Sequence, residues 1–176
     1  MTLLSAVALG ASPVAAEEPS WFQKGRERLT DIWQTGSSDF YVPLRTHHLR
    51  SAYSREQIDR YQEAPLGIGY GRSKFDRDGD LQRVFGMVFQ DSHFKPNYTV
   101  GYAFEKSWRP AADWRLGGGF TAFVMTRPDI GHYTPFPGVL PFGSVSYKNV
   151  SVEATYVPGA GGAGNVVFFW GRFRLD

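Results

Sequence analysis

The sequence predicts an all-β fold, an eight-stranded antiparallel transmembrane β-barrel preceded by an N-terminal amphipathic helix. Aromatic residues make up 16% of the chain and 20 of its 176 residues are glycine, a composition that favours sheets and tight turns over helices. Eight extended segments are separated by turn signals. Within several of these segments apolar side chains alternate with polar ones, as they do in a barrel wall between two environments.

Composition also excludes several classes of function. The formal net charge is only +2 and the basic residues are interleaved with acidic ones, which argues against nucleic acid as a partner. The chain has no cysteine, which excludes disulfides, thiolate catalysis and cysteine-ligated metals. A chain of this length is most simply a single folded domain.

Residues 1–16 are uncharged and small or apolar, which predicts a signal peptide cleaved after Ala16. The usual basic region is missing, so either the true start lies upstream or the signal is weak. The alternative is an unstructured N-terminal tail. No later stretch approaches the ~18 apolar residues of a membrane-spanning helix. The mature protein is therefore either exported and soluble or a membrane β-barrel.

The segment 17–38 contains the one predicted helix, from Trp21 to Trp33. Its apolar positions at helical spacing are Phe22, Leu29, Ile32 and Trp33. Ser20 can cap its start and Gly36 lies just past its end. A helix with a Trp at each end could lie in a membrane interface or dock on a protein core, and this stretch alone favours neither.

Residues 39–176 form the predicted barrel. The extended segments are roughly 39–53, 66–75, 81–90, 97–107, 114–126, 138–147, 150–157 and 165–175. Segments of about 10 residues have the length of a tilted membrane-spanning strand. An even number of antiparallel strands closing on itself leaves no strand edge exposed to lipid.

Alternation within three segments predicts what the barrel encloses. The expected outward residues are Tyr98, Val100, Tyr102, Phe104, Val150, Val152, Ala154, Tyr156, Val167, Phe169, Phe173 and Leu175. Facing inward near the chain termini are Glu105, Glu153, Arg172 and Arg174, which can pair there. The other half of the interior is lined by small or apolar residues, among them Gly101, Val166, Phe168 and Trp170. Such a pocket, closed at its charged end, suits one acyl chain better than a water channel, unless the apolar residues simply pack together.

Four prolines lie inside or at the ends of the extended segments: Pro43, Pro65, Pro141 and Pro158. Each removes one hydrogen-bond donor from a strand ladder. Together they predict lateral gaps in the barrel wall through which a lipid tail could pass. Taken singly, each is also explained as a strand terminator.

Strand direction brings candidate catalytic residues together. If the helix lies on the periplasmic side, the first strand runs outward and ends near His48, at the rim where the loop containing Asp91 and Ser92 emerges. Arg127 and the glycine loop 159–164 share this rim. An imidazole and a hydroxyl at the mouth of an apolar pocket are the groups that acyl transfer needs as general base and nucleophile. Adjacency in sequence does not establish a triad, because that depends on the separations in space.

Several motifs resemble one known family, in the family's order and spacing along nearly the whole mature chain. They are Asp39-Phe40-Tyr41-Val42-Pro43, Thr46-His47-His48, Asp59-Arg60-Tyr61, Gln90-Asp91-Ser92, Ser107-Trp108-Arg109-Pro110, Thr155-Tyr156-Val157-Pro158-Gly159 and Gly164-Asn165-Val166. On these residues the chain resembles the outer-membrane lipid A palmitoyltransferases, the PagP-type enzymes. The resemblance implies an eight-stranded barrel with a periplasmic helix. It also implies transfer of a palmitoyl chain from the sn-1 position of a phospholipid to a hydroxyl of lipid A, at a site facing the cell surface.

The resemblance also assigns residues. It implies His48 rather than His47 as the catalytic imidazole, with Asp91 and Ser92 beside it. Arg127 matches a lipid-A-contacting arginine, and the four prolines match wall gaps. The family has a glycine at the pocket floor where this chain has Ala103, which implies a palmitoyl or slightly shorter chain.

The partners expected from the resemblance are a phospholipid acyl donor, a lipid A or lipopolysaccharide acceptor and the outer membrane. We expect a monomer or weak homodimer. The histidines His47, His48, His93 and His132 lack the spacing of a zinc site, and we expect no metal or other cofactor. The alternatives are a non-catalytic structural or adhesive outer-membrane barrel and an exported lipocalin-like lipid carrier. The outward aromatic rows argue against the carrier.

Overall fold

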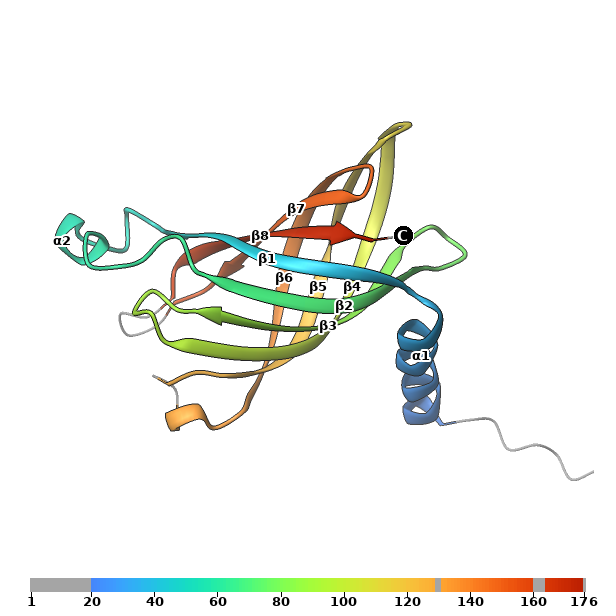
Figure 1. The fold of residues 1–176 in the computed structure, drawn as a ribbon, viewed down its shortest axis with the longest axis horizontal. Helices are drawn as coiled ribbons and strands as arrows, with labels where there is room; N and C mark the ends of the chain where they lie inside the picture. The colour runs from blue at the N-terminus through green and yellow to red at the C-terminus, as the bar shows by residue number, and fades with distance from the viewer. Residues whose placement is uncertain (1–19, 129–130, 160–163, 176) are drawn as a thin grey trace, which may run out of the picture.

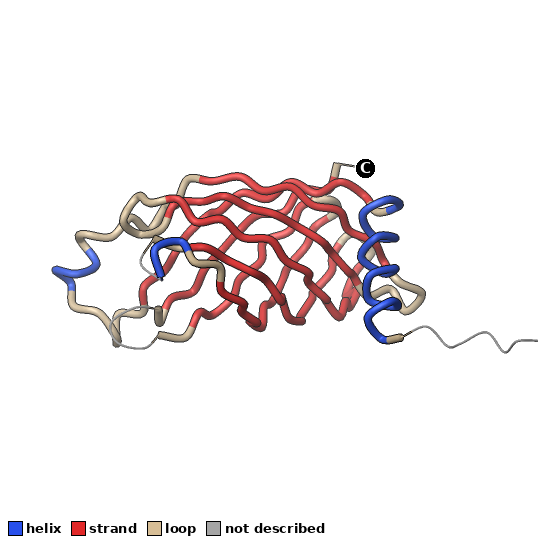
Figure 2. The backbone as a smooth tube through the Cα atoms, turned by 90° about the horizontal axis from the view of Figure 1, so that it is seen from below, coloured by secondary structure: helices blue, strands red, loops and turns tan. Residues whose placement is uncertain are grey.

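The computed structural model describes residues 20–128, 131–159 and 164–175, and the predicted signal peptide lies outside them. Helix α1 (Trp21–Thr35) precedes a closed barrel whose eight antiparallel strands follow chain order. The strands are β1 (Ser37–His48), β2 (Gly67–Phe75), β3 (Leu81–Gln90), β4 (Pro96–Ala111), β5 (Trp114–Thr126), β6 (Phe136–Tyr147), β7 (Val150–Val157) and β8 (Val166–Arg174). Helix α1 lies at one end of the barrel, and the short helices α2 (Arg55–Ile58) and η1 (Gly131–Tyr133) lie at the other (Figures 1 and 2).

The predicted fold class is confirmed, but some boundaries were wrong. The first strand ends at His48 rather than at residue 53. Ser54 and Gln57 exchange hydrogen bonds of 3.0 and 3.3 Å in a capping box, which starts α2 instead. Strand β4 continues to Ala111 rather than to residue 107. Its pairing with β5 shifts register between Trp108 and Ala111, and this irregularity accommodates Pro110 within the strand. Helix α1, β6 and the other strands differ from prediction by two residues or fewer at each end.

The predicted alternation is confirmed where the side chains can be compared. Exposed outward residues include Tyr98, Val100, Val150, Val152, Tyr156 and Phe173. Buried inward residues include Thr99, Ala103, Glu105, Ser151, Glu153, Thr155, Trp170 and Arg172. The barrel therefore has an apolar outer wall and a mixed interior.

An irregularity in β1 decides which of two adjacent histidines faces inward. The pairing of β1 with β8 shifts register between Pro43 and Arg45. Tyr41 points inward and is 2% exposed, so strict alternation would also turn His47 inward. The extra residue at the shift reverses the alternation, and His48 is the one that is buried, at 3% exposed.

A network of charged side chains fills the interior near α1, and all are buried except the partly exposed Arg174. Its members are Asp39, Arg83, Glu105, Glu153, Arg172 and Arg174, of which Asp39 and Arg83 were not predicted. Arg83 bridges two carboxylates, with Nη2 3.2 Å from Glu105 and Nη1 2.7 Å from Oε2 of Glu153. Arg172 donates from Nε to Glu153 at 2.8 Å. Removing one member of such a network leaves a partner charge buried and costs about 3–5 kcal/mol.

Two strand ladders are incomplete toward the α2 end of the barrel. Pairing of β1 with β2 ends at Tyr41 and Gly69, so the rest of β1 is paired only with β8 among the described residues. Pairing of β6 with β7 ends at Phe142 and Thr155. Pro43 and Pro65 flank the first interruption, and Pro141 and Pro158 flank the second. All four prolines therefore lie where a ladder stops.

Helix α1 is attached to the barrel by a few side chains, both polar and apolar. Lys74 Nζ on β2 donates to both carboxylate oxygens of Asp31, at 2.8 and 2.9 Å. Ile32 is buried, whereas Trp21 is 84% and Phe22 64% exposed. The protein therefore leaves most of the apolar face of α1 uncovered. None of the described helices is long and apolar enough to cross a membrane.

Candidate active site

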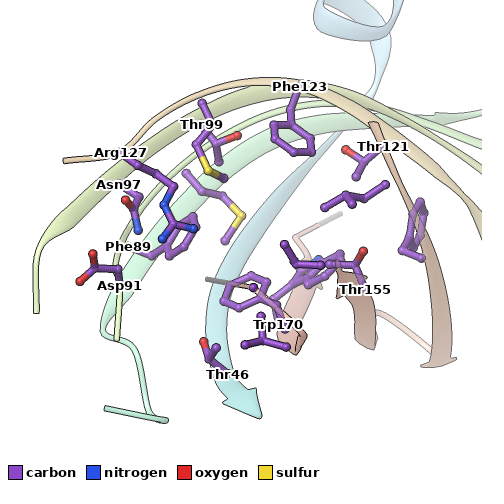
Figure 3. A pocket seen from close by; sticks show the side chains of 18 of the residues that line it. Thr46, Phe89, Asp91, Asn97, Thr99, Thr121, Phe123, Arg127, Thr155 and Trp170 are labelled. Atoms are coloured by element: carbon purple, nitrogen blue, oxygen red, sulfur yellow. The ribbon is translucent and has the colours of Figure 1, made fainter. Parts of the chain in front are cut away.

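An internal cavity of about 500 Å³ runs from the α2 end of the barrel to the charged network. Its wall is mostly aromatic and aliphatic, with Phe89, Met125 and Phe168 among the lining residues. Figure 3 shows Arg127, Asn97 and Asp91 close together, with Thr121 and Thr155 on the opposite side of the view. The mouth is thus polar and the shaft apolar, as for a ligand with a polar head and one apolar tail.

The mouth of the cavity brings His48 and Ser92 into contact. Ser92 Oγ lies 3.1 Å from His48 Nε2, although the two residues belong to different strand ends. The His48 ring stacks on Tyr61 at 4.7 Å and meets the edge of Tyr53 at 5.2 Å. The backbone N–H of Gln62 donates to the carbonyl of Ser92 at 3.0 Å, which joins the two loops. An imidazole held this way can act as a base on the hydroxyl.

Glu63 stands on the other side of His48, and sequence reasoning did not find it. The backbone N–H of His48 donates to Glu63 Oε1 at 3.2 Å, and Nδ1 lies 3.5 Å from the same oxygen. Arg45 donates to Oε2 at 2.8 Å. Partial burial alone would raise the pKa of Glu63, but the hydrogen bonds from Arg45 and the His48 backbone outweigh burial and lower it. Glu63 is therefore ionised beside the imidazole.

Asp91 makes different contacts from those of Glu63. Its Oδ1 accepts hydrogen bonds from the backbone N–H groups of His93 and Lys95, both at 2.8 Å. These bonds fold the loop that carries Ser92. Asp91 also lines the cavity mouth. The ring of His93 packs edge-on against Tyr61 at 5.3 Å, so His93 contacts the site from outside the His48–Ser92 pair.

Of the three remaining predicted binding residues, two line the cavity and one does not. Arg127 lines the mouth, and Ala103, 3% exposed, lines the inner end. Gly101 was expected to line the pocket, yet it is not among the cavity-lining residues. A Cβ on Gly101 would lie 2.9 Å from both Phe85 Cζ and Phe123 Cβ, so these rings cover its backbone and line the cavity in its place.

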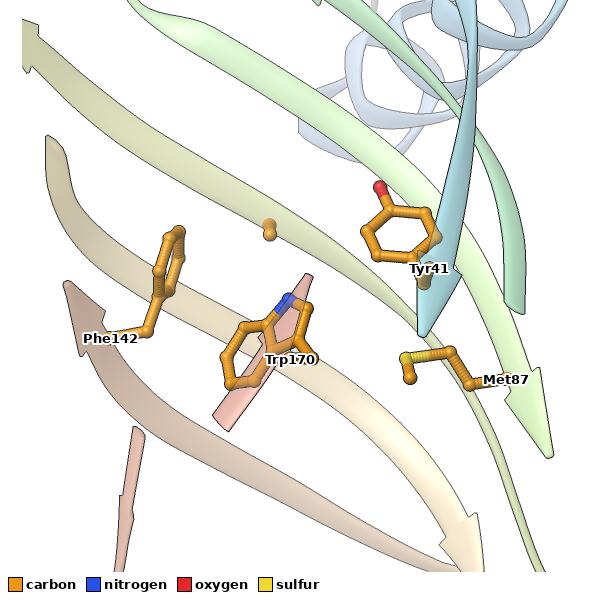
Figure 4. Close-up of a cluster of buried hydrophobic side chains, with 5 residues drawn as sticks. Tyr41, Met87, Phe142 and Trp170 are labelled. Atoms are coloured by element: carbon orange, nitrogen blue, oxygen red, sulfur yellow. The ribbon is translucent and has the colours of Figure 1, made fainter. Parts of the chain in front are cut away.

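The inner end of the cavity is formed by a cluster of buried side chains. Tyr41, Met87, Phe142 and Trp170 converge there from four strands (Figure 4). Phe168 stacks on Trp170 with their centroids 5.7 Å apart. The apolar shaft therefore ends on an aromatic cluster, directly against the buried charges.

These features define a closed β-barrel with an apolar outer wall and an apolar inner cavity, which has an imidazole–hydroxyl pair at its mouth. A family model described as "Antimicrobial peptide resistance and lipid A acylation protein PagP" matches residues 28–172. The chain belongs to this family, the lipid A acyltransferases, whose fold is an outer-membrane barrel.

Individual relatives agree with this assignment. The chain is 42% identical over 166 residues to "Lipid A acyltransferase PagP" of Methylobacillus flagellatus, which covers 94% of this chain and 90% of the relative. The protein of the same name from Pectobacterium atrosepticum is 44% identical over 161 residues, covering 90% of this chain and 74% of the relative. The protein of the same name from Bordetella parapertussis is 41% identical over 166 residues, covering 94% of this chain and 91% of the relative.

Proposed function

We propose that this chain transfers a palmitoyl or slightly shorter acyl chain from the sn-1 position of a phospholipid to a hydroxyl of lipid A. The observation that carries the proposal is the 3.1 Å contact between His48 Nε2 and Ser92 Oγ at the mouth of an apolar cavity. The tail of the donor would occupy the cavity, which places its ester carbonyl beside the two side chains.

The proposed reaction is an ester exchange. His48 takes the proton from the attacking hydroxyl, which belongs to Ser92 in a two-step exchange or to lipid A in a direct one. The attacking oxygen forms a bond to the acyl carbon, and the bond from that carbon to the glycerol oxygen breaks. His48 returns the proton to the glycerol oxygen, so a lysophospholipid leaves and no water is consumed. In the two-step exchange the lipid A hydroxyl then attacks the acyl-Ser92 ester, and His48 moves the proton of that hydroxyl to Ser92 Oγ as the bond from Oγ to the acyl carbon breaks. Arg127, at the same mouth, offers a cation to an anionic group of the substrate.

Two carboxylates would support this chemistry in different ways. Glu63 approaches His48 Nδ1 and the Ser92 hydroxyl lies at Nε2, so the three groups stand in series across the imidazole. Asp91 shapes the Ser92 loop through its two backbone hydrogen bonds, and its charge lies at the mouth where the substrate head would sit. We therefore assign Glu63 as a positioning residue and keep Asp91 as a candidate catalytic residue.

Lipid tails would enter through the barrel wall rather than from water. The two interrupted ladders, at Pro43 and Pro65 and at Pro141 and Pro158, supply openings beside the cavity mouth. We assign the α1 end to the periplasmic side, where the uncovered Trp21 and Phe22 would lie in the membrane interface. The mouth with His48 and Ser92 then faces the cell surface.

Mass spectrometry of lipid A from cells with and without the protein tests this function. We expect lipid A that carries one additional acyl chain only when the protein is present. Unchanged lipid A in both cultures would favour the alternative, a structural or adhesive barrel whose rim residues only face water. The donor position is tested with phospholipids labelled separately at the sn-1 and sn-2 chains.

Replacing Ala103 by Gly tests the inner end of the cavity. Ala103 is buried and lines that end, so removal of its methyl group deepens the cavity. We expect the preferred donor chain to lengthen by about one methylene, since burying one methylene favours binding by about 0.8 kcal/mol. Transfer from phospholipids of defined chain length measures the preference. An identical chain-length profile for both proteins would count against Ala103 as part of the floor.

A further inference from the structure

The cavity ends at the same level on β3 and β7, which lie four strands apart in the closed barrel. On β3 its lining residues are Gln90, Phe89, Met87, Phe85 and Arg83, and on β7 they are Val157, Thr155 and Glu153. Among the described residues, the next inward-facing positions, Leu81 on β3 and Ser151 on β7, do not line it. The two charged side chains at this level are Arg83 and Glu153. An acyl chain that fills the cavity therefore ends against an ion pair.

We propose that Arg83 is a specificity-determining residue that limits the length of the acyl chain. The proposal rests on the proposed function, because it assumes that the cavity holds the donor tail. The family resemblance placed the floor at Ala103, and sequence analysis assigned no role to Arg83.

Arg83 is held from three sides and cannot easily move out of the cavity. Its Nη1 donates to both carboxylate oxygens of Glu153, and its Nη2 lies 3.2 Å from Glu105. Its guanidinium carbon lies 4.9 Å from the centroid of the Phe142 ring. The side chain is 2% exposed. A group with this many contacts keeps one position, as a sharp length limit requires.

Arg83 and Ala103 are directly opposite each other in the β3–β4 register, yet they resist a longer tail differently. Ala103 presents one methyl group, against which a tail can shift or bend. Arg83 presents a guanidinium whose buried ion pairs a longer tail would have to separate, which is strongly unfavourable. Arg83 should therefore set the upper limit on chain length, and Ala103 should adjust the fit below it.

The test variant removes the guanidinium without leaving an unpaired carboxylate buried in the barrel. Arg83→Leu is combined with Glu105→Gln, which preserves the net charge. Residue 105 can keep its hydrogen bond from Ser144 Oγ, which is 2.9 Å in the wild type. Glu153 keeps its 2.8 Å bond from Arg172. The matched control is Arg174→Gln, because Arg174 belongs to the same network but does not line the cavity.

Two measurements are made on each protein. The first is transfer from phosphatidylcholines with sn-1 chains of increasing length. The second needs no catalysis: it is the increase in thermal unfolding temperature caused by alkylphosphocholines of the same lengths, in a detergent too bulky to enter the cavity. For the double variant we expect both optima to move to chains about two or more methylenes longer, with a gain of roughly fourfold per accommodated methylene. Arg174→Gln should keep the wild-type optima.

Wild-type optima in the folded double variant would overturn the role of Arg83, and so would an equal shift in Arg174→Gln. If the double variant does not give a heat-resistant barrel, Arg83→Lys replaces it. Lysine keeps the positive charge with a smaller head group. We then expect a smaller shift of both optima toward longer chains, and unchanged optima would again overturn the role of Arg83. Absence of transfer by the wild type from every donor would contradict the proposed function instead. The alkylphosphocholine series would then still decide whether Arg83 limits the depth of the cavity.

Discussion

Ser92→Ala and His48→Ala are each expected to abolish acyl transfer while the barrel stays folded. The Ser92 hydroxyl and the His48 imidazole are 3.1 Å apart at the cavity mouth. Each variant removes one of the two groups in contact there: His48 is the base in either form of the proposed exchange, and Ser92 is the nucleophile in the two-step form. A positioned general base contributes typically 10²–10⁴-fold to a rate, and a lost nucleophile costs at least as much. Neither side chain belongs to the buried charged network, so the structural cost should be small.

Transfer from a labelled phospholipid to lipid A in mixed micelles measures this effect. Heat-resistant migration of the unboiled protein in gels shows whether each variant keeps its barrel. His47→Ala is the matched control, because His47 adjoins His48 but faces away from the interior, since the register shift in β1 turns His48 inward instead. We expect the control to retain nearly full activity. Full transfer by both Ser92→Ala and His48→Ala would remove the basis of the proposed mechanism.

The choice between His47 and His48 shows where alternation along a strand stops being informative. Counting inward positions from Tyr41 selects His47, whereas the buried residue is His48. The register shift between Pro43 and Arg45 inserts one residue and reverses the faces. Composition does not locate such a shift, although a proline within a strand-like run signals that one is possible. Only the family resemblance selected His48 from the sequence.

The charged network could be predicted only in part, for a similar reason. Glu153 and Arg172 alternate regularly with apolar neighbours along their strands, so their inward position could be predicted from the sequence. Arg83 occurs in a segment with apolar residues on both faces, and Asp39 stands at the first position of the predicted barrel. Pairing between strands distant in sequence decides which charges meet, and it is visible only in the structure.

Glu63 could not be assigned because it lies in a connection rather than in a strand. The segment between α2 and β2 has no periodicity from which a direction could be read. Its contacts with Arg45 and with the backbone of His48 turn the carboxylate toward the imidazole. A carboxylate shortly after the Asp59-Arg60-Tyr61 motif, in a loop at the same rim as His48, was the only signal available.

Glu63→Ala is expected to lower the rate of transfer by about 10²-fold, within the range attributed to a positioned general base. The variant removes both the charge and the acceptor that hold His48. Glu63→Gln should cost much less, because its amide oxygen can still accept from the His48 backbone N–H and keeps its place beside Nδ1. It should nevertheless change the pH dependence. The lowered pKa of Glu63 keeps it ionised throughout the range, around pH 6.5, in which an imidazole titrates.

The direction in which Glu63→Gln shifts the pH dependence of transfer follows from the negative charge that the variant removes. A base must be neutral to accept a proton, so transfer declines on the acid side as His48 becomes protonated. A neighbouring carboxylate favours the protonated imidazole. Loss of the Glu63 charge should therefore move the acid limb of the pH–rate profile to lower pH. Asp91→Asn is the matched comparison, because asparagine keeps the Oδ1 that accepts from His93 and Lys95 and loses only the charge. An acid limb that moves in Asp91→Asn but not in Glu63→Gln would assign the control of His48 to Asp91.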